Sequence, residues 1–239
     1  MKHAEFTFDQ DLLELIPGKR RRNPLLYEFR GPQSTKHLIE ALGIPHTEVS
    51  SVSVAGIPVD PGYLVRDGDR LEVHGGAAME RPQSEPRFAI DGHLGRLAAG
   101  LRMLGLDCLY QGQVPDDQLY EEALAEARYL LTRDRRLLMR KSLVLGYLVR
   151  SLDPQVQLAE VCRRFGLARW AAPFRRCIRC NHLLESVEKN AVLDRLEPLT
   201  RTYFDDFRLC PSCKQIYWKG SHFERMQARI ADLLARGGN

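Results

Sequence analysis

The chain has 239 residues, of which 44% are hydrophobic and 28% charged, with a formal net charge of +4. This composition excludes long disordered, collagen-like and coiled-coil chains, and the length favours one or two globular domains. The longest nearly unbroken apolar stretch, residues 143–149, is too short for a helix that crosses a bilayer. The polar and acidic N-terminus does not resemble a secretory signal, so we expect a cytoplasmic protein.

The net charge conceals an uneven distribution along the chain. Residues 1–80 contain 9 lysines and arginines against 12 acids, which gives −3; the rest of the chain contains 35 − 9 = 26 against 31 − 12 = 19, which gives +7. We therefore expect a basic surface that binds a polyanion such as RNA to lie in the C-terminal part.

The first segment has the pattern of a β-grasp fold. One helical pattern, residues 34–42, stands among short strand-like runs at residues 4–8, 25–29, 52–55 and 70–74. We expect a β-grasp domain over residues 1–76, followed by a polar linker with two prolines over residues 77–86.

The end of this segment, VDPGYLVRDGDRLEVHGG (residues 59–76), resembles the ubiquitin-like sulfur-carrier family. Sulfur carriers end at their paired glycines, whose carboxylate is activated. Here Gly75 and Gly76 continue into Ala77, so carrier chemistry would require cleavage. A fused module that binds a protein partner or a substrate is the favoured interpretation.

From Arg87 the pattern changes to alternating strands and helices, which predicts a parallel sheet with crossover helices over residues 87–170. The expected strands are residues 88–90, 108–110, 129–132 and 143–149. The expected helices follow them, and cover residues 94–104, 118–127, a short segment from Arg135, and 154–165.

Aspartates follow the expected strands. Asp91, Asp134 and Asp153 come just after strand ends, and Asp116 or Asp117 comes a few residues after another. Ligands of open parallel sheets bind outside the carboxyl ends of the strands, so these acids can converge. Clustered carboxylates favour a hard divalent ion, Mg²⁺ or Mn²⁺, which can activate water against a phosphodiester. Because each aspartate also precedes a helix, the alternative is that it only caps that helix.

Arginines near these acids suit a phosphate-backbone substrate, since guanidinium groups bind phosphate through paired hydrogen bonds. Arg102, Arg135 and Arg136 are among them, and Arg96 and Arg133 are the preferred candidates for substrate binding. The alternative for each arginine is a solvated helix face.

The cysteines predict a metal site in the last part of the chain. Cys177 and Cys180 form one C-x-x-C pair, and Cys210 and Cys213 form a second after 29 intervening residues. Such pairs close a tetrahedral structural zinc site, with an iron–sulfur or redox dithiol site as the alternative. We expect a zinc ribbon and a final helix, residues 223–235, within residues 171–239. Tyr217 and Trp218 could stack RNA bases or pack the ribbon against the preceding domain.

Three motifs in order carry a more specific resemblance. AIDGHLGRLAAGLRMLGLDCLY, PDDQLYEEALAEARYLLTRDRRLL and the segment from RCIRCN to CPSCKQIYWKGSH resemble the Mut-seven C-terminal RNase family, a PIN-like fold with a C-terminal zinc ribbon. The resemblance implies a metal-dependent ribonuclease with Asp91, Asp117 and Asp134 as catalytic acids and Asp153 as a fourth. Asp116, Glu121 and Glu122 compete for the second position.

The sequence therefore predicts an α/β protein made of a β-grasp domain, a PIN-like domain and a Cys₄ zinc ribbon. The predicted activity is hydrolysis of RNA with a carboxylate-bound Mg²⁺ or Mn²⁺. One alternative is a noncatalytic RNA-binding or adaptor protein, and another is a sulfur-carrier-like fusion.

Overall fold

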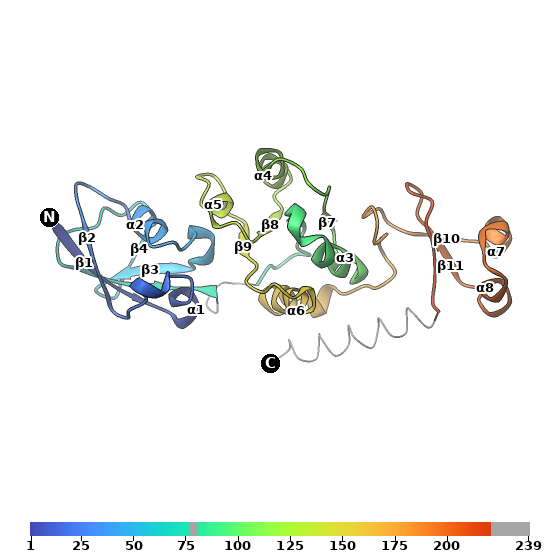
Figure 1. Ribbon diagram of the computed structural model, residues 1–239, viewed down its shortest axis with the longest axis horizontal. Helices are drawn as coiled ribbons and strands as arrows, with labels where there is room; N and C mark the ends of the chain where they lie inside the picture. The colour runs from blue at the N-terminus through green and yellow to red at the C-terminus, as the bar shows by residue number, and fades with distance from the viewer. Residues whose placement is uncertain (77–80, 221–239) are drawn as a thin grey trace. The chain divides into compact units, whose positions relative to one another are not determined.

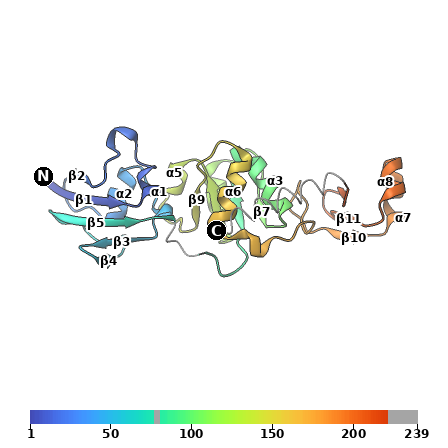
Figure 2. The same ribbon diagram turned by 90° about the horizontal axis from the view of Figure 1, so that it is seen from below.

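The computed structural model describes residues 1–76 and 81–220 (Figures 1 and 2). Contacts within the chain divide it into two compact units. The first unit is Met1–Arg81 with Asp116–Leu148, and the second is Pro82–Pro115 with Val149–Asn239. This division runs through the expected α/β region, so the boundaries 1–76, 77–86, 87–170 and 171–239 stay a prediction.

The first unit begins with a five-stranded mixed sheet in the order β2-β1-β5-β3-β4. Its strands are β1 (Lys2–Phe8), β2 (Leu25–Phe29), β3 (Ser51–Val54), β4 (Ile57–Val59) and β5 (Asp69–His74). β1 and β5 run parallel, and the other neighbours are antiparallel. Alternate residues of β1, Ala4, Phe6 and Phe8, are buried, as expected of a strand with one face on a core.

A helix of two turns packs on this sheet. α2 (Thr35–Ala41) lies across one face (Figures 1 and 2) and buries Leu38 and Ile39. The Ser34 side chain caps it by accepting a hydrogen bond from the His37 N–H. Shorter helical turns are α1 (Gln10–Leu13), η1 (Gly18–Arg20) and η2 (His46–Glu48). The predicted β-grasp fold is confirmed.

β4 is a strand that sequence patterning does not predict. Ala55 and Gly56 both have positive φ, the backbone of a tight two-residue hairpin turn, and this turn pairs β3 with β4. The strand is short and contains Pro58, so it has little periodicity of its own.

The first unit also contains α4 (Asp116–Ala125), β8 (Tyr129–Thr132), α5 (Arg135–Leu138) and β9 (Gly146–Leu148). β8 and β9 pair in parallel, as predicted. The expected strand over residues 143–149 is too long, because the Leu143 N–H turns back to the Arg140 carbonyl before β9 begins.

The two segments of the first unit are joined by polar contacts. The buried Glu48 carboxylate in η2 accepts a hydrogen bond from the Leu148 N–H of β9 at 2.7 Å. The Arg135 guanidinium donates to the carbonyl oxygens of Leu15 and Gly43. The β-grasp sheet and the helix that follows Asp134 are thereby fixed to each other.

The second unit contains β6 (Phe88–Ile90), η4 (Gly92–Leu94), α3 (Gly95–Met103), β7 (Cys108–Leu109), α6 (Pro154–Phe165) and η5 (Leu167–Trp170). β6 and β7 are parallel, and all three residues of β6 are buried. Gly105 follows the C-cap of α3; its φ is +87°, and a Cβ there would lie 2.1 Å from the Ala172 carbonyl oxygen. Only glycine fits there.

The last described part is an antiparallel sheet in the order β10-β11-β12, which we call the ribbon sheet. Its strands are β10 (Glu185–Val187), β11 (Phe207–Leu209) and β12 (Ile216–Trp218). Between the first two lie α7 (Lys189–Val192), η6 (Leu193–Arg195) and α8 (Pro198–Tyr203). Trp218 packs on the small core of Val192, Leu196, Phe207 and Ile216. The helix expected over residues 223–235 lies outside the described residues.

Among the residues that the structure describes, none of the helices has the length and apolar character needed to cross a membrane.

Candidate metal centre and strand-end acids

The four paired cysteines meet at one point of the second unit. Their sulfur atoms all lie within 4.8 Å of one another, with 3.5 Å between Cys177 and Cys213 and 3.3 Å between Cys180 and Cys210. Tetrahedral Zn–S bonds of about 2.3 Å place sulfurs at comparable separations. Four thiolate donors at this spacing fit a metal ion such as zinc, and a metal with four sulfur ligands has no coordination position open for substrate.

The two C-x-x-C segments share one backbone conformation. In the first knuckle (residues 177–182) the Asn181 N–H donates to the Cys177 carbonyl, and in the second knuckle (residues 210–215) the Lys214 N–H donates to the Cys210 carbonyl. Asn181 and Lys214 both have positive φ, 71° and 58°. This repeated turn aims both cysteines of each pair at the same point.

Hydrogen bonds favour ionisation of one of the four thiols, that of Cys180. Burial opposes ionisation of Cys180, but hydrogen bonds from the His182 backbone and from the neighbouring thiols lower the pKa of Cys180 to about 6. The Tyr217 hydroxyl lies 3.2 Å from the Cys177 sulfur and accepts a hydrogen bond from the Ile178 N–H. Tyr217 therefore supports the four-cysteine cluster, a role that residue spacing alone does not indicate.

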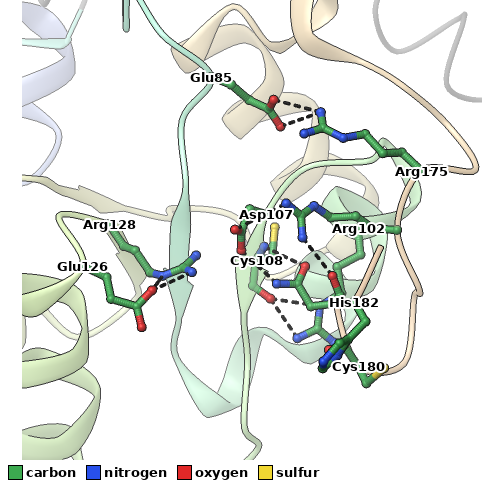
Figure 3. A network of polar contacts seen from close by, with 11 residues as sticks. Glu85, Arg102, Asp107, Cys108, Glu126, Arg128, Arg175, Cys180 and His182 are labelled. Carbon is green, nitrogen blue, oxygen red and sulfur yellow. Dashed lines mark hydrogen bonds and ion pairs between the residues drawn. The ribbon is translucent and has the colours of Figure 1, made fainter. Parts of the chain in front are cut away.

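The first knuckle is fastened to β7 by a buried arginine (Figure 3). The Arg102 guanidinium donates to the Cys108 carbonyl on β7 at 2.8 Å and to the Arg179 carbonyl in the knuckle at 2.9 Å. Arg102 is 4% exposed, and burial lowers the pKa of its guanidinium group. Arg102 was expected among the cations near the acids, but its side chain serves this structural contact instead.

Asn181 completes the fastening. Its side-chain oxygen accepts from the Cys108 N–H at 3.0 Å, and its amide nitrogen donates to Asp107 at 2.8 Å. One residue thus supplies both the left-handed turn of the knuckle and a bond to the strand beside it.

Asp91 belongs to the second unit. It follows β6 directly, is 9% exposed, and its Oδ1 accepts a hydrogen bond from the His93 N–H at 3.0 Å. A buried carboxylate at a strand end therefore also caps η4.

Asp134 and Asp153 are exposed N-caps in different units. Asp134 Oδ1 accepts from the Arg136 N–H at 2.7 Å, and Asp153 Oδ1 accepts from the Gln155 N–H at 2.7 Å. The cap function expected as the alternative is present at both positions. A carboxylate has two oxygens with several lone pairs, so capping through Oδ1 is compatible with metal binding through Oδ2.

The second acid position is different. Asp117 lies in the first turn of α4, its side chain is 85% exposed, and its Oδ1 pairs with the Arg140 guanidinium at 2.5 Å. Among the competitors, Glu122 accepts a hydrogen bond from Gln118.

The candidate substrate-binding arginines are both exposed, Arg96 on α3 in the second unit and Arg133 after β8 in the first. Arg135, by contrast, is engaged with the β-grasp segment. Cys162 belongs to neither C-x-x-C pair and is buried, and burial raises its pKa to about 12, so its thiol is an unreactive part of the apolar interior.

The paired glycines of the β-grasp segment are part of its folded structure. The Gly75 N–H donates to Asp9 and the Gly76 N–H donates to Asp11. A Cβ at Gly75 would lie 2.6 Å from Leu12. Close packing therefore explains why glycine is needed there.

Comparison with known protein families finds a match for two regions of the chain. The model of the Mut7-C RNAse domain matches residues 86–230, and the model of the Mut7-C ubiquitin domain matches residues 1–80. Neither a curated protein nor a solved structure matches the chain significantly. The chain belongs to the Mut7-C RNase domain family, with a Mut7-C ubiquitin domain preceding the RNase domain.

Proposed function

We propose that this protein is a metal-dependent ribonuclease in which Asp91, Asp117, Asp134 and Asp153 hold Mg²⁺ or Mn²⁺. The observation that carries the proposal is the RNase family match over residues 86–230, which contains all four acids. The placement of Asp91 and Asp134 just after β6 and β8 supports it.

Each part of the chain has a role in this proposal. A divalent ion, when bound, would activate water and stabilise charge on the phosphate. The capping hydrogen bonds from His93 and Arg136 orient the Asp91 and Asp134 carboxylates. Exposed Arg96 and Arg133 would bind RNA phosphates. The four cysteines would hold a structural zinc ion, and the ubiquitin domain could bind a protein partner.

The test is cleavage of labelled RNA by zinc-loaded protein, with and without added Mg²⁺ or Mn²⁺. Chelators are avoided because they would also remove zinc, and zinc content is measured by elemental analysis in every arm. Asp91→Asn keeps a capping side chain but loses a charge, so it separates metal binding from folding. We expect cleavage to require the added ion and to fall at least about 100-fold in the variant. Full activity of the variant would reject the proposal.

The second candidate is a noncatalytic RNA-binding or adaptor protein. Two observations favour it: the strand-end aspartates act as helix caps, and Asp117 is paired with Arg140. RNA binding without cleavage under every metal condition would support this function. The sulfur-carrier alternative is not favoured, since Gly75 is buried and held by Asp9.

A further inference from the structure

A run of four consecutive cations, Lys19, Arg20, Arg21 and Arg22, lies in the ubiquitin domain between α1 and β2. It contains 4 of the 9 lysines and arginines of residues 1–80, so the net charge of −3 hides a strongly basic segment. We call residues 19–22 the basic loop. Its four residues are all exposed.

One arginine fixes the loop and leaves the other three cations outward. The Arg21 guanidinium turns back to donate to the carbonyls of Glu14, at 2.9 Å, and Ile16, at 3.3 Å. In the part of the chain that the structure describes, the side chains of Lys19, Arg20 and Arg22 take part in no ion pair or hydrogen bond. These three charges are therefore available to a ligand.

The next residue anchors the loop on its other side. The Asn23 side chain accepts from the Phe8 N–H at 3.0 Å and donates to the Phe8 carbonyl at 2.9 Å, in the manner of a neighbouring strand. Held at both ends, the loop presents its cations without a large ordering cost on binding.

A pocket of about 540 Å³ lies beneath these cations. Its lining combines the three charged side chains with the apolar Pro24, Leu25, Leu26 and Leu42 and the aromatic Tyr27. Glu28 also lines it and is paired with His3 at 3.3 Å. Cations around an apolar and aromatic floor suit single-stranded nucleic acid, whose phosphates pair with guanidinium groups and whose bases stack.

The basic loop is fixed to the same unit as Asp134. Arg135, the residue after Asp134, donates to the Leu15 carbonyl, just before the loop, and to the Gly43 carbonyl, next to Leu42 in the pocket. A strand of RNA on the loop would therefore bind to the body that carries one of the candidate catalytic acids.

We propose that Lys19, Arg20 and Arg22 of the ubiquitin domain form a binding site for the phosphate backbone of single-stranded RNA. The proposal rests on the proposed function for the identity of the polyanion. It makes the ubiquitin domain part of the substrate-binding surface, which composition had placed only in the C-terminal part.

The test measures RNA binding separately from the RNA cleavage assay described above. Binding of a fluorescent RNA of about 16 nucleotides is followed by anisotropy without divalent ions, over a series of salt concentrations. The test variant is Lys19→Gln with Arg20→Gln and Arg22→Gln. The matched control, Arg30→Gln with Arg66→Gln and Arg70→Gln, removes the same charge from exposed positions of the same domain. Thermal unfolding of both variants checks that each is folded.

We expect the test variant to bind RNA about 10- to 50-fold more weakly near physiological salt, with the slope of log K against log salt reduced by about 2. The control should change affinity far less. Equal losses of RNA affinity in the two variants would overturn the proposal, and so would unchanged RNA binding by the test variant. A test variant that keeps RNA binding but loses binding to phosphatidylserine vesicles would overturn it as well.

The outcome is independent of catalysis. If the test variant binds normally while the wild-type protein cleaves RNA, the loop proposal fails and the ribonuclease stands. If binding depends on the loop but no cleavage is found with any ion, the loop proposal stands and the ribonuclease fails.

Discussion

At the scale of single residues, side chains other than the cysteines determine the geometry of the four-cysteine cluster. The Tyr217 hydroxyl contacts the Cys177 sulfur and the Ile178 N–H of the same knuckle, so it fixes the orientation of the Cys177 side chain. Asn181 supplies the turn of that knuckle and its bond to β7.

We predict that Tyr217→Phe lowers zinc affinity about 10-fold or more, because it removes the hydrogen bond to the Cys177 sulfur and leaves the ring in place. Competition with a chromophoric chelator measures this affinity. Tyr203→Phe is the control, since Tyr203 lies on α8, is 71% exposed and does not belong to the group of residues packed around the cysteines. Equal zinc affinities of the wild type and Tyr217→Phe would show that the hydroxyl has no such role.

At the scale of elements, Arg102 joins α3, β7 and the first knuckle. Its guanidinium satisfies carbonyl oxygens of Cys108, Tyr110, Ile178 and Arg179. Since these carbonyls come from different segments, the arginine joins the four-cysteine cluster to the α/β part of the second unit.

We therefore predict that Arg102→Met lowers the free energy of unfolding by about 3 kcal/mol, because buried carbonyls lose charged donors. Urea unfolding of zinc-loaded protein measures the change. Arg96→Met on the same helix is the control, since Arg96 is exposed and its loss should cost less than about 0.5 kcal/mol. Similar stabilities of the two variants would contradict the role assigned to Arg102.

Sequence patterning predicts helices and strands well where the local residues alone determine which side chains are buried. The run 88–90 and the helical pattern 154–165 appear unchanged as β6 and α6, because continuous apolar residues and an Asp-Pro helix start leave little choice. The strand predicted over residues 143–149 is longer than β9, since its first apolar residues belong to a turn before the strand. Arg102 and Tyr217 could not be assigned, because their roles depend on contacts between residues distant in sequence.

At the scale of the whole molecule, the net charge of a segment does not show where its basic residues are concentrated. The ubiquitin domain is acidic in total, yet its basic loop presents three cations on the unit that also contains Asp134. The Glu48 and Arg135 contacts join these two segments of the first unit. A ribonuclease built this way would bind RNA with both of its family domains.

RNA cleavage by the proposed mechanism requires the strand-end aspartates as metal-binding carboxylates, and not only as helix caps. The most direct measurement is the single-turnover cleavage rate of zinc-loaded wild type, Asp134→Asn and Asp134→Ser over a series of Mn²⁺ concentrations. Both substitutions keep a capping side chain at the start of α5. We predict that both retain the wild-type melting temperature and lose cleavage at least about 100-fold at every Mn²⁺ concentration. Wild-type cleavage rates in both folded variants would contradict the claim.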